Sequence, residues 1–425
     1  MLKKIQENQD FSEVLKKGIV ALLIRVMGFL AGYIFIYYTV KFFGAETQGR
    51  LALSFSFMII GSLFCRLGID ISLVKVFAIE GNLDNAKGVY FKLLPYILAL
   101  SVLVSLLVFY FSPTISVLFF DDPELNVYLQ WTAPCIVFYT FILINAAVFR
   151  GLRKNTLYSF LFNGGRFVFT LLFFGALLFG IKKDPVYAVI AHSLAIFGLF
   201  AMSFYYIYKF IFPRVKTSKY RSKTFVVQSL PMLFAGSMIV FLGWSDTIIL
   251  GVFRDSSVVG MYSVVLKVAA VTSFTFQAID SILAPKLSKA FHNDDMALFK
   301  RLVKFSTLIN LGVSVVVVFG IILFKGFILG IFGTEFYMAS TALIILCVGQ
   351  LFNAICGPVG SILQMTGHQK VFQNILFIAL IINISLNLLL VKKYGINGVA
   401  TATAVSLAFW NVTSVVYIKR VIFIK

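Results

Sequence analysis

The sequence has little charge for its length. Only 13% of its 425 residues are Asp, Glu, Lys or Arg, and just 17 of these are acidic. A domain exposed to water carries most of its charged residues on its surface, so this scarcity excludes a soluble globular protein and any large extramembrane domain. By contrast, 60% of the residues are hydrophobic, whereas about 45–50% is usual in soluble domains.

Cysteine and histidine are also scarce, with four and three residues. The cysteines lie in apolar runs without a CxxC motif, and the histidines are far apart in the sequence. No Ser/His/Asp arrangement and no metal-ligand spacing is present. We therefore expect reduced cysteines, no metal, no cofactor and no catalytic site. A membrane enzyme that builds glycans would also need longer loops to hold its reaction.

Apolar runs that can cross a bilayer repeat along the whole chain. A bilayer core of roughly 30 Å needs about 20 apolar residues in a helix. Six spans are predicted in the first half, near residues 18–40, 51–68, 93–111, 127–149, 156–180 and 186–208. Six more are predicted near residues 225–249, 260–284, 305–324, 336–360, 371–391 and 396–418. The sequence therefore predicts an all-α polytopic membrane protein with 12 transmembrane helices.

Most basic residues lie in loops on one side of the predicted membrane. If the N-terminus is cytoplasmic, 26 of the 37 Lys and Arg residues fall in segments predicted to be cytoplasmic. This bias follows the positive-inside rule and places both termini in the cytoplasm. The net charge of +20 is spread over short loops instead of forming an arm or patch, so no nucleic-acid partner is expected.

The two halves of the chain repeat each other. A shift of 212 residues aligns Lys92 with Lys304. A shift of 211 aligns Gly49 with Gly260. Because each half holds an even number of spans, the halves share one orientation in the membrane. We expect an N-terminal six-helix lobe that starts with a short interfacial helix, a basic cytoplasmic linker and a C-terminal six-helix lobe, over residues 1–208, 209–224 and 225–425.

Two arginines lie deep inside predicted spans. A lone Arg at a helix centre costs about 2.5–3.5 kcal/mol on insertion scales. Arg25 is too deep in span one to reach the inner interface comfortably, and Arg166 lies near the centre of span five. The preceding Gly164 and Gly165 permit close helix approach or local unwinding. Each arginine is either a substrate contact or one member of a structural ion pair.

Span eight contains Lys267 and span seven contains Asp246, the one clear intramembrane carboxylate. Lys267 either extends toward the outer interface along its long side chain or serves the substrate. A pair between Asp246 and Lys267 would be either architectural or a coupling element that opens with protonation or substrate arrival. Three buried cations and one buried anion imply a central cavity with a positive potential. Phosphate or pyrophosphate is the natural passenger for such a cavity.

Several segments together resemble one transporter family. They are FFGAETQG at residues 42–49, RLGIDISL after span two, FRGLRKNTLY after span four, and DTIILGVFRDSSVVGMYSVV across spans seven and eight. With Arg25 in span one, they resemble the polysaccharide exporter and O-antigen flippase branch of the multidrug/oligosaccharidyl-lipid/polysaccharide (MOP) exporter superfamily. The resemblance covers essentially the whole chain.

The resemblance implies two pseudo-symmetric six-helix lobes around a central cavity. It implies a flippase that moves an undecaprenyl-pyrophosphate-linked oligosaccharide, such as an O-antigen unit for lipopolysaccharide, from the inner to the outer leaflet of a bacterial cytoplasmic (inner) membrane. Arg25, Arg166 and Lys267 would then contact the pyrophosphate or acidic sugars. The implied partners are this lipid-linked oligosaccharide, membrane lipids, and a glycan polymerase with other assembly proteins. The alternative is a multidrug or cation antiporter of the related multidrug branch, although spans one to six offer only Asp70 as a carboxylate.

Overall fold

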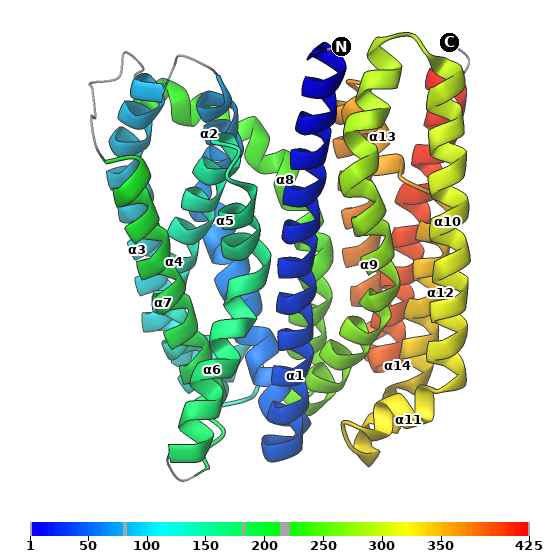
Figure 1. The fold of residues 1–425 in the computed structure, drawn as a ribbon. Coiled ribbons are helices and arrows are strands. Elements are labelled where there is room, and N and C mark those ends of the chain that lie inside the picture. Colours follow the sequence, from blue (N-terminus) through cyan, green and yellow to red (C-terminus); the bar gives the residue numbers. More distant parts are fainter. Residues whose placement is uncertain (1, 80–82, 181–182, 213–221, 424–425) are drawn as a thin grey trace. The chain divides into compact units, whose positions relative to one another are not determined.

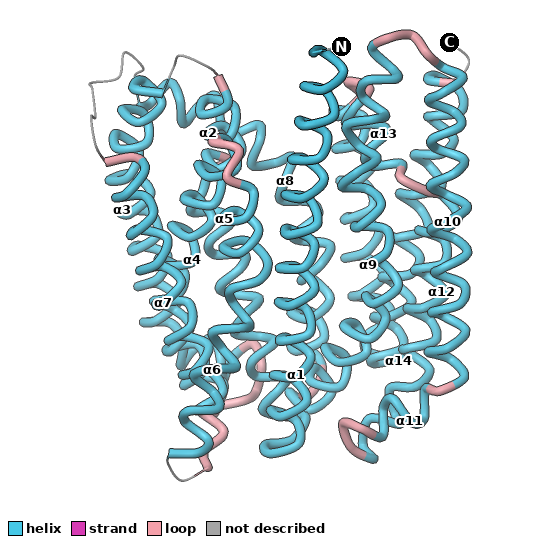
Figure 2. The backbone as a smooth tube through the Cα atoms, viewed as in Figure 1, coloured by secondary structure: helices cyan, strands magenta, loops and turns pink. Residues whose placement is uncertain are grey.

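The computed structural model describes residues 2–79, 83–180, 183–212 and 222–423, which form helices joined by short turns (Figure 1). The elements up to the middle of the chain are α1 Leu2–Arg66, α2 Ile69–Ala78, α3 Leu83–Leu118, α4 Leu125–Gly151, α5 Asn155–Ser159, the π-helical turn η1 Phe160–Gly164, α6 Gly165–Gly180 and α7 Tyr187–Phe210. The later elements are α8 Ser222–Phe253, α9 Ser256–His292, α10 Met296–Leu323, α11 Lys325–Gly330, η2 Thr334–Ala339, α12 Ser340–Cys356, α13 Val359–Met365, α14 Gln369–Tyr417 and η3 Ile418–Ile422. Within the described ranges the backbone forms no strand (Figure 2).

Ten helical segments of the described chain are long and apolar enough to cross a membrane. Two of them contain a break, at Gly44 in α1 and at Gly395 in α14, where φ is 81° and 52°. Glycine adopts such positive φ values without the steric cost that a side chain brings. Each break falls between two predicted spans, so each of these long helices is two spans joined across a glycine. The predicted all-α membrane fold is confirmed.

Span ten differs from its prediction. The sequence predicts one span near residues 336–360, whereas α12 ends at Cys356 and α13 begins at Val359. Gly357 has a φ of 74°, and Pro358 has no N–H to donate to the preceding turn. Together they end the helix within the predicted span.

The chain divides into two compact units. Unit 1 comprises Met1–Phe43 and Leu53–Ser237, and unit 2 comprises Gly44–Ala52 and Met238–Lys425. The expected boundary at residues 209–224 therefore misses two exchanged segments, 44–52 and the start of α8. Most of the predicted linker, residues 213–221, lies outside the described residues, as do the side chains of the predicted interfacial helix at residues 2–17. The assignment of two six-helix lobes remains a prediction.

A contact between two glycines explains why residues 44–52 belong to unit 2. A Cβ atom on Gly49 would overlap the carbonyl oxygen of Ser256, and one on Gly260 would overlap the carbonyl oxygen of Ala45. The backbones of α1 and α9 therefore touch, as small residues permit between membrane helices. These are the two glycines that the 211-residue shift aligns, so the repeat places equivalent positions in contact.

A similar contact holds the start of α8 in unit 1. A Cβ atom on Gly68 would overlap the carbonyl oxygen of Ser229. The Ser229 hydroxyl donates a hydrogen bond of 2.7 Å to the Ser72 hydroxyl of α2. These close approaches join segments far apart in the sequence, and no apolar pattern signals them.

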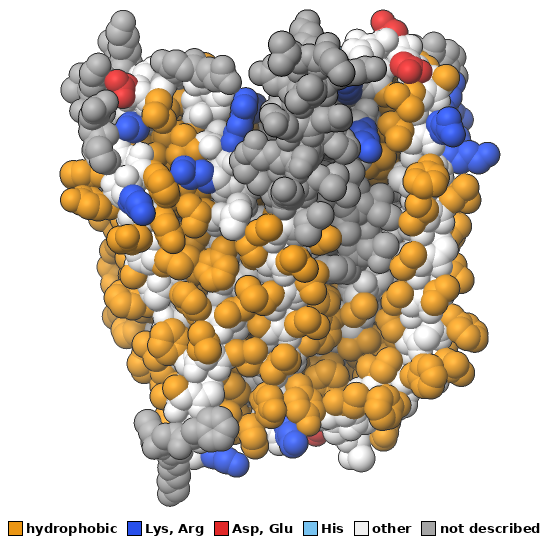
Figure 3. Space-filling model, in the orientation of Figure 1, with side chains coloured by type: hydrophobic (Ala, Val, Ile, Leu, Met, Phe, Trp, Pro, Cys, Tyr) orange, Lys and Arg blue, Asp and Glu red, His pale blue; other side chains and the backbone are white. Residues whose placement is uncertain are grey.

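The interior of unit 1 is built on α3, α4 and α7, which pack together. The Tyr90 hydroxyl donates a 2.6 Å hydrogen bond to Asn145 Oδ1, and Asn145 Nδ2 donates a 2.9 Å bond to Ser203 Oγ. In unit 2, α9, α10, α12 and α14 pack together. Apolar side chains cover the middle of the helices on the face shown in Figure 3, and Lys and Arg side chains lie toward the helix ends. This is the surface that a helix spanning a bilayer requires.

Candidate functional site

The region around Arg166 begins with a tight helix crossing in unit 1. Just before Arg166 the helix forms the π-helical turn η1. A Cβ atom on Gly164 would lie 2.6 Å from Ile24 Cγ2, and one on Gly28 would lie 2.6 Å from the carbonyl oxygen of Asn163. The close approach and local irregularity expected at these glycines are therefore present. A π-helical turn inside an α-helix commonly marks a functional position.

Arg166 lies against three aromatic rings. Its guanidinium carbon is 4.8 Å from the Phe55 ring centroid, 4.9 Å from that of Phe167 and 5.7 Å from that of Tyr139. The Nε and Nη2 atoms are buried and have no hydrogen-bond partner, while the side chain as a whole is half-buried. Within the described part of the chain no carboxylate forms an ion pair with it. Cation–π contacts stabilise the charge but leave the hydrogen-bonding edge of the guanidinium unused.

A fully buried histidine completes this region. His192 on α7 has 0% exposure, and its ring centroid is 4.0 Å from that of Phe55. Its Nδ1 lies 3.2 Å from Thr170 Oγ1, whereas its Nε2 has no partner. We call the seven residues Phe55, Tyr139, Asn163, Arg166, Phe167, Thr170 and His192 the Arg166 cluster.

His192 and Asn163 are not among the predicted site residues, because neither falls in a catalytic or metal-binding spacing. One signal was available. An ionisable residue inside a membrane span is rare enough to be a functional candidate by itself, and His192 lies inside the span of α7.

The other two predicted cations occupy different places. Arg25 is half-buried on α1, one residue after Ile24, which packs on η1. Among the described residues it forms no hydrogen bond or ion pair. Lys267 is half-buried on α9 in unit 2. The structure therefore brings the elements of Arg25 and Arg166 together within unit 1, while Lys267 belongs to the other unit.

Asp246 is the centre of a second polar cluster, in unit 2. Its side chain is 2% exposed. Its Oδ1 accepts hydrogen bonds from Asn383 Nδ2 at 3.1 Å and from Asn387 Nδ2 at 2.7 Å. Its Oδ2 accepts bonds from the hydroxyls of Tyr262, at 3.0 Å, and Thr403. We call these five residues the Asp246 cluster.

The donors to Asp246 are all neutral, and Lys267 is not among them. The expected ion pair between Asp246 and Lys267 is therefore replaced by a set of four hydrogen bonds. The donors come from α9 and from both sides of the break in α14, which only the fold brings together. Asn383 and Asn387 stand four residues apart in an apolar run, and this spacing was the available signal.

Asp70 has a local structural role just after the end of α1. It lies in the first turn of α2 and accepts a hydrogen bond in an ion pair with Arg66. Asp280 stands 210 residues after Asp70, at the equivalent place in the second half of the repeat, and its side chain lies outside the described residues.

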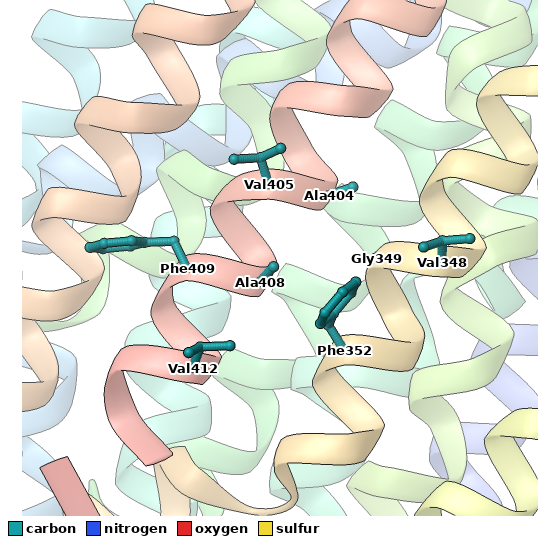
Figure 4. Close-up of a pocket in the computed structure, with 8 residues that line it drawn as sticks. All are labelled: Val348, Gly349, Phe352, Ala404, Val405, Ala408, Phe409 and Val412. Carbon is teal, nitrogen blue, oxygen red and sulfur yellow. The ribbon is translucent and has the colours of Figure 1, made fainter. Parts of the chain in front are cut away.

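Unit 2 also carries an apolar hollow of about 500 Å³ between α12 and α14 (Figure 4). Its walls are apolar side chains that include Val348, Phe352, Val405 and Phe409. A hollow with no polar group cannot orient a sugar or a phosphate.

The comparison with known families decides the family of this chain. The polysaccharide biosynthesis protein family matches residues 14–291.

The chain belongs to the polysaccharide biosynthesis protein family. The MatE family also matches residues 231–389. With ten long apolar helices in its described part, this polysaccharide biosynthesis protein is a multi-pass membrane protein.

Two relatives align with this polysaccharide biosynthesis protein. The probable low-salt glycan biosynthesis flippase Agl15 of Haloferax volcanii is 31% identical over 186 residues. That match covers 44% of the chain and spans only 39% of the flippase. An uncharacterized membrane protein of Methanocaldococcus jannaschii is 25% identical over 402 residues, which cover 91% of the chain and 94% of the relative.

Solved structures of the MOP superfamily share the fold. The lipid II flippase MurJ in an inward closed conformation superimposes with a TM-score of 0.77 at 16% identity, over 95% of this chain and 87% of MurJ. A multidrug resistance MATE family transporter in an inward-facing conformation gives a TM-score of 0.73 at 15% identity, over 95% and 97% of the two chains. At these identities the likeness concerns the fold alone.

Proposed function

We propose that this protein is a flippase that moves a lipid-linked oligosaccharide with an acidic headgroup across the membrane. The observation that carries the proposal is the Arg166 cluster, in which a guanidinium lies inside a membrane protein without a carboxylate partner among the described residues. A charge kept in so costly a place needs a compensating anion at some stage. Family membership and the matched flippase make a glycan lipid the cargo to test first.

The proposed cargo is an undecaprenyl-pyrophosphate-linked repeat unit of the O-antigen type. Its pyrophosphate would offset the charge of Arg25 and Arg166, while its hydrocarbon tail remains in the lipid. The cargo would enter from the inner leaflet and leave from the outer leaflet by alternating access. Binding shifts the equilibrium between two states only if the cargo contacts them differently, and we assign that difference to Arg25, Arg166 and Lys267.

The test is export in a strain that lacks the chromosomal gene. Surface glycan should be restored by the wild-type plasmid and should fall at least tenfold with Arg25→Ala or Arg166→Gln. Arg420→Gln is the matched control, because Arg420 is an exposed arginine near the C-terminal end. Normal surface glycan from either variant, with its amount in the membrane confirmed by immunoblot, would reject the proposal.

The proposal includes a topology in which both termini face the cytoplasm and glycosyltransferases on that side supply the cargo. Single cysteines introduced near the termini of a cysteine-free variant should react with a membrane-impermeant maleimide only after lysis. Labelling in intact cells would reverse the proposed orientation.

A second candidate, a multidrug or cation antiporter, is favoured by the MatE match over residues 231–389. That stretch contains Asp246, a carboxylate of the kind that binds protons or cationic drugs. Expression in a drug-sensitive strain separates the two functions. Raised resistance to cationic dyes without a change in surface glycan would support the antiporter.

A further inference from the structure

Three basic side chains of unit 1 gather where the end of α4 and the turn after it meet the end of α7. The Lys154 ammonium lies 3.5 Å from the Phe210 ring centroid, and the Lys209 ammonium lies 5.9 Å from the same centroid. The guanidinium carbon of Arg150, four residues before Lys154, lies 5.3 Å from the Tyr158 ring centroid. We name Arg150, Lys154 and Lys209 the α4–α7 cation group.

The aromatic side chains under this group belong to the packed interior of unit 1. The Phe210 ring stacks on Tyr206 with centroids 6.1 Å apart, and Phe149 of α4 packs edge-on against Phe210 at 6.4 Å. Phe210 is therefore held in place from both helices. The positions of the two ammonium groups over its ring follow from the fold, because Lys154 and Lys209 lie 55 residues apart in the sequence.

The α4–α7 cation group has no carboxylate partner in the described part of the chain, where none of its members forms an ion pair. Between Glu124 and Asp246 the sequence contains one acidic residue, Asp184, which precedes the opposite end of α7. Two ammonium groups over one ring repel each other, and a cation–π contact is weak at an exposed site. The positive-inside rule accounts for basic residues on one side of a membrane, but not for this convergence on a single ring. The arrangement is complementary to an anion that contacts both lysines.

The surroundings of the group are those of a membrane–water interface. Arg150 and Lys209 are exposed and Lys154 is half-buried, while Tyr205 and Tyr208 of α7 are 59% and 66% exposed. Exposed tyrosines beside cations at the end of an apolar helix mark the headgroup level of a bilayer. The 24 residues of α7 span about 36 Å at 1.5 Å per residue, so the helix end reaches beyond a hydrocarbon core of roughly 30 Å. Figure 3 shows Lys and Arg side chains toward the helix ends of unit 1 and apolar side chains along the middle of its helices.

From this geometry we infer that the α4–α7 cation group binds the phosphate of an anionic phospholipid in the adjoining leaflet, which is the cytoplasmic leaflet in the proposed topology. The phosphate oxygens accept hydrogen bonds from Lys154 and Lys209, and Arg150 adds a further positive charge. The exposed tyrosines favour a lipid over a free anion, because their rings lie among headgroups while the acyl chains remain in the bilayer. The bound lipid joins the turn after α4 to the end of α7. The inference needs only the location in a membrane and is independent of the cargo.

The test releases the purified protein from nanodiscs of mixed phosphatidylcholine and phosphatidylglycerol and measures the retained lipids by native mass spectrometry. Wild type should retain phosphatidylglycerol in preference to phosphatidylcholine. Each lysine changed, in Lys154→Gln and Lys209→Gln, should lower that preference about fivefold. Lys419→Gln is the matched control, because Lys419 is an exposed lysine at the end of unit 2, and it should leave the preference unchanged. No preference in the wild type, or an unchanged preference in the double lysine variant, would overturn the inference.

Two further measurements separate charge from folding and lipid from free anion. Lys154→Arg keeps the charge and should keep the preference, whereas a loss as large as that of Lys154→Gln would show that the lysine acts through packing. Inorganic phosphate added at constant ionic strength should not displace phosphatidylglycerol, and displacement would assign the group to a soluble anion instead. Phosphatidylglycerol should also raise the unfolding temperature of the wild type more than that of the double variant, and high salt should reduce this difference. Equal increases in both proteins would contradict a bound lipid that joins α4 to α7.

Discussion

The two polar clusters are centred on an acidic and a basic side chain, and they differ in how many hydrogen-bonding atoms of that side chain have partners. Asp246 is surrounded by four neutral donors that satisfy both carboxylate oxygens. Arg166 is surrounded by aromatic rings, and two of its nitrogens have no hydrogen-bond partner. A group whose bonds are complete contributes to the fold, whereas a group with unused bonding capacity is available to a ligand. We therefore propose that the Asp246 cluster is architectural and that the Arg166 cluster binds a ligand.

The largest effect on export is expected from the loss of the Arg166 charge in unit 1. Arg166→Met should abolish export while leaving the protein as stable as the wild type or more stable, because it removes a charge that costs about 2.5–3.5 kcal/mol at a helix centre. Thermal unfolding followed by fluorescence-detected size exclusion measures the stability. A large drop in stability would show that Arg166 is a structural member of the bundle.

The next effect concerns the helix crossing that positions Arg166. Gly28→Val should prevent folding, because a Cβ there would lie 2.6 Å from the backbone atoms Asn163 O and Gly164 Cα. Gly175→Val is the matched control, since a Cβ on Gly175 has no atom within 4 Å. Equal yields of both variants from membranes would contradict the crossing.

Substitutions of Asp246 should lower the stability of the protein, whereas those of Arg166 should lower export without lowering stability. Asp246→Ala leaves the buried donors around it without an acceptor. One buried donor left unsatisfied costs about 1–3 kcal/mol, so the free energy of unfolding should fall by at least this amount. Asp246→Asn, which keeps the shape and two acceptor sites, should lose less. Export should follow stability in both variants. Loss of export by a fully stable Asp246→Asn would make the carboxylate a coupling element instead.

The smallest effect is expected at Tyr262. Tyr262→Phe removes one donor from a carboxylate that keeps three others, so the stability should fall by about 0.5–1.5 kcal/mol. Its hydroxyl also lies 3.2 Å from Thr403 Oγ1, and Thr403 can still donate to Asp246. A loss as large as that of Asp246→Ala would mean that Tyr262 is the dominant partner in the cluster.

Arg25, Arg166 and Asp246 are candidates from the sequence alone, because a charge inside an apolar run is visible without coordinates. Asn163 and His192 are not, because a buried amide or imidazole becomes notable only when the hydrogen bonds around it are known. The sequence also suggests Lys267 as the partner of Asp246, since opposite charges in neighbouring spans are the simplest pair to assume. Asn387 and Thr403 take that place, and they come from two sides of a helix break that brings both toward the carboxylate.

The sequence by itself determined the helices and their apolar surfaces, because the bilayer selects runs of about 20 apolar residues and each run reports its own length. The sequence also shows the internal repeat, because a constant shift along the chain aligns identical residues of the two halves. Only the tertiary structure decided that residues 44–52 and the start of α8 exchange between the units, and which buried polar atoms have partners. Both depend on contacts between segments far apart in the chain, and the free energy of a buried polar group is set by its neighbours in space.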